Sequence, residues 1–352
     1  MTTTILLKLD IRDPDLSKIR DVARASREGK IIAFPTETVY GMGGPASVPN
    51  IADTLAQIKK REPGKAFSYH IGGWEMLGAL KVKRTPAFRF LTRFFWPGPL
   101  TVIAWNQSDE KIGIRFPKNR LALALIQAVG EPFVATSANL SGETSPRTAD
   151  EVMAHLSGHI DYLIDGGRTE MEQDSTIVDL TGPEPVIARR GADTAAVEKM
   201  IERIKLGKYP RKRVLFVCTG NSCRSPMAAG YLAKELRNKG LQDQIEVASC
   251  GIGTRNGSTA TTEAQFVMKN REVDISGHRS RPCAREDVLD ADLVFAMSNE
   301  HFIFITGFVP EAKNKIKVFN IPDPIGMGMM IYEEVANSIE KRIKEYWKEI
   351  IA

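Results

Sequence analysis

Apolar residues in the first 200 positions of this chain fall into two alternating patterns. Continuous apolar runs, which are typical of buried strands, occur at IIAF (31–34), LTVIAW (100–105), IGIRF (112–116) and PFVATS (132–137). Apolar residues at helical spacing predict helices at IADTLAQIKK (51–60), LALALIQAV (121–129) and ADEVMAHL (149–156). Alternating strands and helices predict an α/β fold, in which a parallel sheet carries helices on both faces.

The alternation is more regular in the second part of the chain. The run VLFV (214–217) precedes a predicted helix that begins at Pro226. Further strands are predicted at IEVAS (245–249), LVFAM (293–297) and IKVF (316–319), with helices between them and a long helix at the end. This pattern predicts a doubly wound, parallel four-stranded sheet.

The basic stretch IERIKLGKYPRKR (201–213) separates the two patterns. It leaves a helical segment and ends where a new buried strand begins. A chain of 352 residues is long enough for two domains that each bury a core. We therefore predict a first domain over residues 1–207, a linker over 208–212 and a second domain over 213–352.

Composition narrows the class of protein. With 43% hydrophobic and 26% charged residues, the chain has the make-up of an ordinary soluble globular protein. All four cysteines lie at or beyond residue 218, so disulfides cannot hold the first domain together. We find neither a secretory signal nor an apolar run of the roughly 18–20 residues that a membrane span needs, which predicts a reduced cytoplasmic protein with no membrane partner. The net charge of +5 fits anionic ligands or RNA without deciding between them.

The motif CTGNSCRSP (218–226) lies between a buried strand and a predicted helix. Ser225 and Pro226 suit the first positions of that helix, while Gly220 and Asn221 readily adopt left-handed conformations. Such a loop turns several backbone N–H groups toward one point at the positive end of the helix dipole. The motif therefore predicts an oxyanion-binding loop.

Two side chains give this loop a chemical role. Arg224 carries a planar, charged fork that binds two phosphate oxygens at once. The same field favours the thiolate of Cys218, which we expect to ionise easily and to attack a bound phosphoryl group in line. An inert packing cysteine does not explain the full nine-residue string. A zinc site needs about four ligands, whereas Cys250 and Cys283 are isolated in the sequence, so we predict no metal site.

Residues 213–352 resemble the low-molecular-weight protein phosphatase family in this Cys-x5-Arg-Ser loop and in Asp323-Pro324 near the end of the chain. The resemblance implies attack by Cys218, with Arg224 and the loop amides holding the transition state. It implies that Asp323 protonates the leaving group and then activates water to hydrolyse a phosphocysteine intermediate, without a cofactor. Cys223 matches a second loop cysteine that can form a reversible disulfide with the nucleophile. The supporting loop residues that it implies are Thr219, Gly220, Asn221, Ser222, Cys223 and Ser225.

Two places bear on which phosphoprotein side chain this domain dephosphorylates. Tyrosine-specific members carry a bulky aliphatic residue where this chain has Ser222, and aromatic residues where it has Ile325 and Gly326. A small polar loop residue and an acid loop without aromatics resemble the protein-arginine phosphatase branch, which has threonine at the first position. The resemblance therefore favours phosphoarginine over phosphotyrosine. Arsenate reductases share the loop, but they need a closely spaced cysteine pair that Cys250 and Cys283 do not form in the sequence.

Polar residues also cluster at predicted strand ends in the first domain. PTETVYG (35–41) and TSANLSG (136–142) each follow a buried strand, and ligands of open sheets gather at strand ends. KKREPGK (59–65) places cations near a helix end, where a solvated terminus is the simplest interpretation. Each motif alone is a weak signal of a ligand site.

Together and in this order, these motifs resemble the threonylcarbamoyl-AMP synthase family, or YrdC domain, over residues 10–195; further matches are WPGPLT, IRFP, DSTIVD and ARRGA. Members condense L-threonine, bicarbonate and ATP, which is accompanied by Mg²⁺, into threonylcarbamoyl-adenylate and pyrophosphate. The product feeds a tRNA modification, which implies tRNA or the tRNA threonylcarbamoyl-transfer machinery as a partner. The implied contacts to threonine or its carbamoyl product are Thr36, Tyr40, Lys59, Arg61, His70 and Ser175. The implied contacts to the nucleotide and its phosphates are Lys65, Arg115, Ser137, Asn139 and Arg190.

The chain departs from this family at the entrance of the predicted site. Lys65-Ala66-Phe67 stands where the family usually has Lys-Pro-Leu, and the chain continues GMGGPAS where the family tends to have Gly-Leu-Gly-Ala-Asp. These changes bear on turnover rather than on the fold. One alternative therefore stays open, a first domain that binds RNA or a nucleotide without catalysis. Another is a second domain that only senses phosphate or binds a partner, against which the intact Cys218, Arg224 and Asp323 argue.

Overall fold

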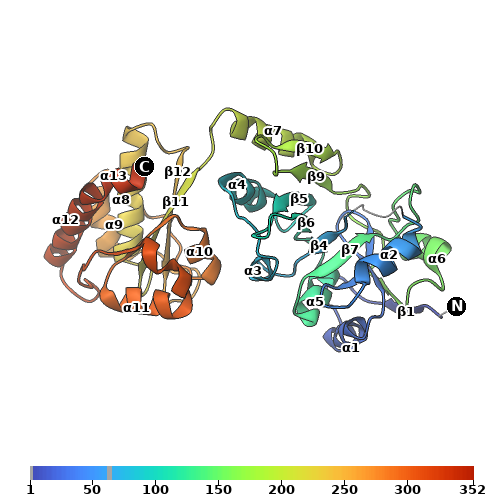
Figure 1. The fold of residues 1–352 in the computed structure, drawn as a ribbon. Coiled ribbons are helices and arrows are strands. Elements are labelled where there is room, and N and C mark those ends of the chain that lie inside the picture. Colours follow the sequence, from blue (N-terminus) through green and yellow to red (C-terminus); the bar gives the residue numbers. More distant parts are fainter. Residues whose placement is uncertain (1–2, 62–65) are drawn as a thin grey trace. The chain divides into compact units, whose positions relative to one another are not determined.

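The computed structural model describes residues 3–61 and 66–352. The chain divides into two compact units, Met1–Leu206 and Gly207–Ala352 (Figure 1). No helix in the described ranges is long and apolar enough to cross a membrane.

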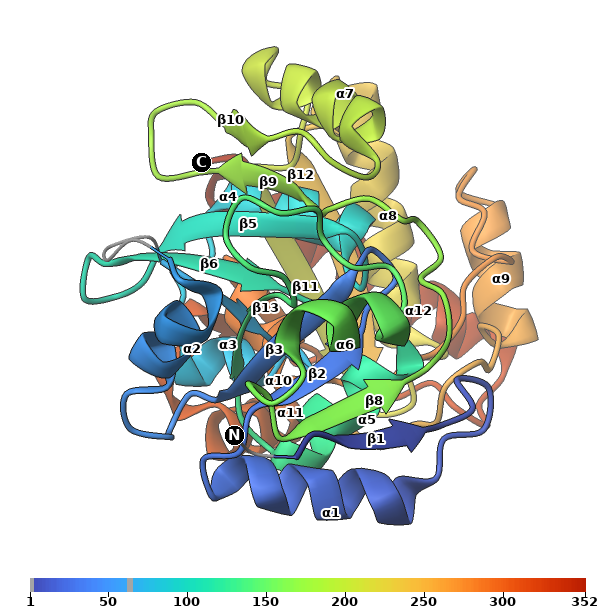
Figure 2. The same ribbon diagram turned by 90° about the vertical axis from the view of Figure 1, so that its right-hand side faces the viewer.

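The first unit is built on one large mixed sheet. Among the described residues its strands are β1 (Ile5–Lys8), β2 (Ile32–Pro35), β3 (Tyr40–Pro45), β4 (Ser68–His70), β5 (Leu100–Trp105), β6 (Lys111–Arg115), β7 (Phe133–Ser137), β8 (Tyr162–Asp165), β9 (Thr176–Asp179) and β10 (Val186–Arg189). They pair in the order β1-β8-β2-β3-β7-β4-β6-β5-β9-β10. Figure 2 shows β1 and β8 toward one end of this sheet and β9 and β10 toward the other.

The expectation of a parallel sheet is wrong for this unit. The pairs β2–β3, β3–β7, β4–β7, β5–β6 and β9–β10 are antiparallel, whereas β1–β8, β2–β8, β4–β6 and β5–β9 are parallel. The cause is visible in PTETVYG, which is a tight turn in which Thr36 N donates to Val39 O at 3.2 Å. A connection this short can join only antiparallel strands.

Helices cover both faces of the sheet. They are α1 (Leu16–Arg27), α2 (Ile51–Lys59), α3 (Met76–Ala79), α4 (Pro86–Phe95), α5 (Arg120–Val129), α6 (Ala149–Leu156) and α7 (Thr194–Lys205). Apolar residues of α2 and α6 share a core cluster with β3 and β7, and α1 packs against α5, which contacts β2. Gly43 permits the close β3–β7 pairing, because a Cβ there would lie 2.1 Å from Val134 O.

The second unit has the predicted doubly wound, parallel four-stranded sheet. Its strands are β11 (Lys212–Cys218), β12 (Ile245–Gly251), β13 (Leu293–Ala296) and β14 (Ile316–Val318). They pair in the order β12-β11-β13-β14, and every pair is parallel. The helices are α8 (Arg224–Asn238), α9 (Thr262–Lys269), α10 (Arg285–Asp290), α11 (Asn299–Phe308), α12 (Met329–Glu345), α13 (Trp347–Ile351) and the 3-10 helix η1 (Pro310–Lys315).

Successive residues of β11 face opposite sides of this sheet, which explains its two cores. Val214 and Phe216 pack in a cluster with residues of α8, α9 and α12. Leu215 and Val217 pack with residues of α10, α11 and η1. Figure 1 shows α8, α9 and α12 on one side of β11 and α10 on the other. Because the strands are parallel, the segments that follow them gather at one edge, where functional residues of open α/β sheets lie.

Candidate active sites

In the second unit, the CTGNSCRSP motif forms a loop between β11 and α8. Asn221 holds a left-handed backbone conformation, with φ of 51°, that bends the chain back toward the helix. Its neighbour Gly251, at the end of β12, has to be glycine, because a Cβ would lie 2.6 Å from Thr219 O and 3.0 Å from Asn221 N. The loop is therefore shaped both by its own residues and by the end of the adjacent strand.

The side chain of Asn221 fixes this shape from inside. Its Nδ2 donates to Ser225 Oγ at 2.9 Å and to Ser249 Oγ at 3.0 Å. Its Oδ1 accepts from Arg281 N at 3.0 Å, and its backbone oxygen lies 2.7 Å from His278 Nε2. Ser249, His278 and Arg281 were not predicted, since they lie 28 to 60 residues beyond the loop and carry no motif.

The Cys218 thiol lies at the centre of the loop. Its Sγ is 2.9 Å from Ser225 Oγ and accepts from Asn221 N at 3.2 Å. Ser225 Oγ accepts from the Asn221 amide and also lies 3.5 Å from Cys250 O, so its hydrogen can be donated to the sulfur or to that carbonyl. Burial nevertheless raises the pKa of the Cys218 thiol, against the hydrogen bonds of Ser225 and the charge of Arg224, which lower it. The expectation that this thiol ionises easily is therefore wrong for the ligand-free loop.

Arg224 is 4% exposed and reaches across the loop. Its Nη1 donates to Ile321 O at 3.2 Å, and its Nη2 forms an ion pair with Asp323 Oδ2 and lies 3.4 Å from Thr219 Oγ1. Asp323 follows β14, and its side chain is 39% exposed. The three residues predicted to carry catalysis thus lie in one site. Arg224 is thus paired with Asp323 while its charge also lowers the pKa of Cys218, an effect that burial of the thiol outweighs.

The other loop residues have separate neighbours. Cys223 Sγ lies 3.4 Å from Tyr332 Oη, 3.6 Å from Thr261 Oγ1 and 3.7 Å from Ser222 Oγ. Burial and the Cys223 contact raise the pKa of Tyr332 to about 12, so the phenol stays protonated. A reversible Cys218–Cys223 disulfide stays a prediction.

The remaining two cysteines, isolated in the sequence, are neighbours in the structure. Gly251 N donates to Arg281 O at 3.0 Å and Cys283 N donates to Gly251 O at 2.9 Å, which brings Cys283 to the end of β12. A hydrogen bond from Cys283, together with burial, raises the pKa of Cys250 well above its ordinary value. Within residues 3–61 and 66–352, no group of three or more His, Cys, Asp or Glu side chains is placed to hold a metal ion.

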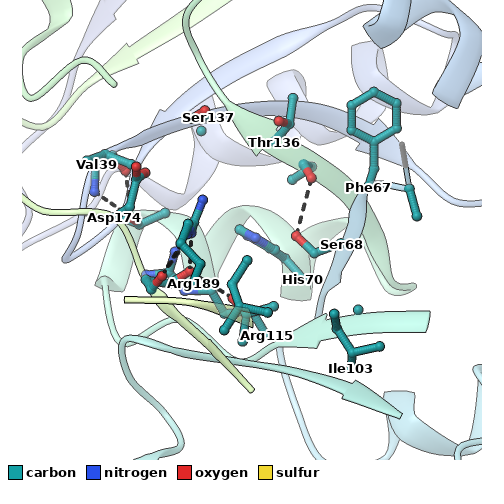
Figure 3. Close-up of a pocket in the computed structure, with 18 of the residues that line it drawn as sticks. Val39, Phe67, Ser68, His70, Ile103, Arg115, Thr136, Ser137, Asp174 and Arg189 are labelled. Atoms are coloured by element: carbon teal, nitrogen blue, oxygen red, sulfur yellow. Dashed lines mark hydrogen bonds between the residues drawn. The ribbon is translucent and has the colours of Figure 1, made fainter. Parts of the chain in front are cut away.

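In the first unit, a cavity of about 340 Å³ opens among the central strands of the sheet (Figure 3). Its lining includes seven of the predicted contacts: Thr36, Tyr40, Arg61, His70, Arg115, Ser137 and Ser175. Thr36 and Tyr40 donate their hydroxyls to backbone oxygens. Thr36 Oγ1 donates to Val39 O at 2.6 Å, and Tyr40 Oη donates to Gly167 O at 2.7 Å.

Lys59 and Asn139 hold the wall of this cavity. Lys59 Nζ donates to Ser137 O at 2.7 Å, to Asn139 O at 2.8 Å and to Asn139 Oδ1 at 2.9 Å. Burial and the charge of Arg61 lower the pKa of Lys59 to about 8, although Asp174 opposes this shift. These hydrogen bonds fix the TSAN segment (136–139) in place. Lys59 also carries a positive charge close to the cavity.

A fully buried ion pair underlies the cavity. Arg115 Nη2 donates to Glu37 Oε1 and to Thr38 Oγ1, each at 2.7 Å, and the two charged side chains are 5% and 3% exposed. Burial alone would raise the pKa of Glu37, but Arg115 outweighs it and lowers that pKa below its usual range. Burial and the Arg115 charge lower the pKa of His70 to about 3, so the imidazole is neutral. Glu37 lies inside PTETVYG and was not assigned a role from the sequence.

At the end of β10 the structure differs from the prediction by one residue. Arg189 lines the cavity and donates from Nη2 to Ser175 O and Ser175 Oγ, each at 2.9 Å (Figure 3). Arg190 lies outside the lining, pairs with Glu198 at 2.8 Å, and its side chain is 69% exposed. Of this Arg-Arg pair, the structure brings Arg189 to the cavity, and a contact of Arg190 with the nucleotide stays a prediction. Lys65 lies outside the described residues, and Asp174 lines the cavity without having been predicted.

Comparisons with known proteins match each unit separately. Residues 24–191 match the family model Sua5_yciO_yrdC, described as telomere recombination. Residues 213–352 match the model described as low molecular weight phosphotyrosine protein phosphatase. The two matches correspond to the two structural units.

Individual relatives agree with this division. A threonylcarbamoyl-AMP synthase of Pyrococcus abyssi is 36% identical over 199 residues, which cover 54% of this chain and 58% of that protein. This chain thus spans less than two thirds of that relative. A protein-arginine-phosphatase of Geobacillus stearothermophilus is 38% identical over 140 residues, which cover 37% of this chain and 90% of that protein. The crystal structure of P. abyssi Sua5 complexed with L-threonine matches 90% of this chain and 99% of its own, at 26% identity and a TM-score of 0.54.

The buried ion pair leads to a testable prediction about stability. We expect Glu37→Gln to destabilise the first unit by roughly 3–5 kcal/mol at neutral pH, because it leaves Arg115 buried without a counter-charge. The folded-state pKa of Glu37 lies below the ordinary 4.5, so its stabilisation is complete above that pH and is lost as the pH falls through the lowered value. Urea unfolding reports this through tryptophan fluorescence, since Trp74, Trp96 and Trp105 belong to the first unit.

The surface carboxylate Glu172, which pairs with Arg168, provides the matched control. Glu172→Gln is expected to leave the unfolding midpoint nearly unchanged. An effect of Glu37→Gln no larger than that of Glu172→Gln, or one that grows in acid, would contradict the role given to the buried pair.

Proposed function

Residues 24–191 belong to the Sua5/YciO/YrdC family and residues 213–352 to the low-molecular-weight phosphotyrosine protein phosphatase family, and on that premise we propose that the chain is a bifunctional enzyme. The first unit makes threonylcarbamoyl-AMP from L-threonine, bicarbonate and ATP. The second hydrolyses a phosphorylated protein side chain. Two observations carry the proposal: the cavity that gathers Arg61, Arg115 and Arg189, and the loop that gathers Cys218, Arg224 and Asp323.

In the first unit, the cations and the small hydroxyl residues have separate roles. Pyrophosphate departure needs positive charge more than an acid–base pair, which we assign to Arg61, Arg189 and the nearby Lys59. His70 and Ser175 contact threonine or its carbamoyl product, in keeping with the L-threonine complex of the P. abyssi relative. Ser137 and Asn139 of the TSAN segment, which Lys59 fixes in place, bind the nucleotide. Mg²⁺ arrives with the phosphates of ATP, and the product passes to tRNA or to the enzymes that modify it.

In the second unit, the phosphoryl group displaces Asp323 from Arg224, and the freed carboxylate takes the proton of the Cys218 thiol. The thiolate attacks phosphorus and the bond to the leaving group breaks. Arg224 and the loop amides hold the equatorial oxygens, and Asp323 gives its proton to the leaving group. Asp323 then takes a proton from water, which hydrolyses the phosphocysteine and frees phosphate. A bound phosphoryl group brings negative charge to Arg224 and releases Asp323 from its ion pair for this work.

Phosphoarginine is the proposed substrate class of the second unit. The relative from G. stearothermophilus bears the name of an arginine phosphatase. Ser222 is half-buried in the loop. Ile325, two residues beyond Asp323, is 59% exposed, and its neighbours in the sequence, Pro324 and Gly326, are not aromatic. An aromatic pair that sandwiches a phenol is thus missing from this part of the acid loop.

The arginine pair at the end of β10 tests the first activity. Arg189→Ala is expected to lower the rate of threonine- and ATP-dependent pyrophosphate release about 100-fold or more, because it removes a charge that faces the reacting phosphates. Arg190→Ala, the matched control, is expected to change it by less than about twofold, since its exposed side chain pairs with Glu198.

A larger loss of pyrophosphate release in Arg190→Ala than in Arg189→Ala would show that Arg190, rather than Arg189, acts in the site. Binding of ATP or RNA by the wild type without any threonine-dependent pyrophosphate release would favour a non-catalytic first unit.

The second activity is tested by comparing substrates. We expect the wild type to hydrolyse phosphoarginine with a higher kcat/KM than a phosphotyrosine peptide, Cys218→Ser to abolish both activities, and Asp323→Asn to lower kcat roughly 100-fold. Ser222→Ile is expected to shift the preference toward phosphotyrosine, because it introduces the bulky aliphatic side chain of the tyrosine-specific branch. A wild-type preference for phosphotyrosine would reverse the substrate assignment, and hydrolysis that survives Cys218→Ser would refute the assigned nucleophile.

A further inference from the structure

A histidine from outside the phosphate loop contacts it in the second unit. His301 lies in the first turn of α11 and is 1% exposed. Its Nε2 is 3.0 Å from Thr219 Oγ1, and its Nδ1 is 2.7 Å from Ser298 Oγ. No part of the mechanism above uses His301 or the hydroxyl of Thr219.

The hydrogen-bond network determines which ring nitrogen carries the proton. Ser298 N donates to His301 Nδ1 at 3.0 Å, and a nitrogen that accepts a backbone N–H carries no hydrogen itself. Burial and the charge of Arg224 lower the pKa of His301 to about 4, although Asp323 opposes this shift, so the ring is neutral near pH 7. The single proton of the ring is therefore on Nε2, which donates to Thr219 Oγ1.

This donation decides what the Thr219 hydroxyl can do. Its oxygen accepts from His301 Nε2 and, at 3.4 Å, from Arg224 Nη2. A hydroxyl has two acceptor positions and one hydrogen, so these two contacts leave only the hydrogen to offer. The same Arg224 nitrogen forms the ion pair with Asp323. The free hydrogen thus lies beside the point where the guanidinium, the carboxylate and an incoming phosphoryl group meet.

We propose that Thr219 donates a hydrogen bond to the transferred phosphoryl group, and that His301 is the positioning residue that holds the Thr219 hydroxyl in this donor role. The inference rests on the proposed phosphatase function of the second unit. A donor fixed before reaction costs no reorganisation when negative charge spreads over the phosphoryl oxygens. Thr219 would contact the reacting group directly, whereas His301 acts only through Thr219.

His301 also has a structural role that the experiment has to separate. Its ring accepts the Ser298 N–H at the start of α11 and so caps that helix. Loss of the ring can therefore weaken α11 as well as release Thr219. A glutamine at position 301 offers an amide oxygen for Ser298 and an amide N–H for Thr219, and so keeps both contacts.

The test is a double-mutant cycle of Thr219→Val and His301→Ala, measured as kcat/KM for phosphoarginine. We expect Thr219→Val to lower kcat/KM roughly 10- to 100-fold, as for a hydrogen bond to a charged group, and His301→Ala to lower it about tenfold. Because His301 acts through Thr219, the double variant is expected to be no slower than Thr219→Val. His301→Gln is expected to recover most of the activity. Thr306→Val, which removes a hydroxyl elsewhere on α11, is the control for helix stability.

Losses that add in full in the double variant, or no recovery with His301→Gln, would overturn the inference and leave His301 as a helix cap. The same cycle is measured on the dissociation constant of inorganic phosphate by titration calorimetry, which needs no turnover. If the Cys218→Ser variant still hydrolyses the substrate, the proposed phosphatase mechanism fails. The phosphate affinities then still test the Thr219–His301 pair. Non-additive changes in the dissociation constant would support the pair, and additive changes would refute it.

Discussion

Burying an arginine is costly unless a carboxylate lies against it, and each unit of this chain buries one at the end of its sheet. Arg115 ends β6 and pairs with Glu37, while Arg224 begins α8 and pairs with Asp323. The surrounding features follow from these pairs. In the first unit, burial and the Arg115 charge keep His70 neutral. In the second, Arg224 contacts both Thr219 and Asp323 of the acid loop.

The two pairs differ in exposure, and this difference separates their functions. The side chains of Arg115 and Glu37 are 5% and 3% exposed, so their buried ion pair holds Arg115 fixed in the cavity wall. Asp323 is 39% exposed and belongs to a loop that follows the last strand of its sheet. In the proposed mechanism, a phosphoryl group replaces Asp323 on Arg224 and frees the carboxylate to transfer a proton. We propose that the first pair organises a binding site and that the second exchanges partners during the reaction.

Local patterns predicted much of this architecture. The four parallel strands of the second unit are short apolar runs that alternate with helices, and the Cys-x5-Arg-Ser string places Cys218 and Arg224 within one loop. The mixed sheet of the first unit was missed because its strand directions depend on tight turns such as PTETVYG. Glu37, Asn221's partners and His301 were missed for a different reason, since their roles arise from contacts between distant segments. The motif ARRGA located the end of β10, but it did not distinguish Arg189, which lines the cavity, from the exposed Arg190.

The mechanism proposed for the second unit implies that Arg224 stabilises the Cys218 thiolate more strongly once it is released from Asp323. The most direct measurement is the pKa of the Cys218 thiol, obtained from the pH dependence of iodoacetamide alkylation with mass spectrometry of the Cys218 peptide, in the wild type and in Asp323→Asn. Removal of the carboxylate charge leaves Arg224 free to stabilise the thiolate. The account predicts a lower thiol pKa in Asp323→Asn than in the wild type. An unchanged or higher pKa in the variant would contradict it.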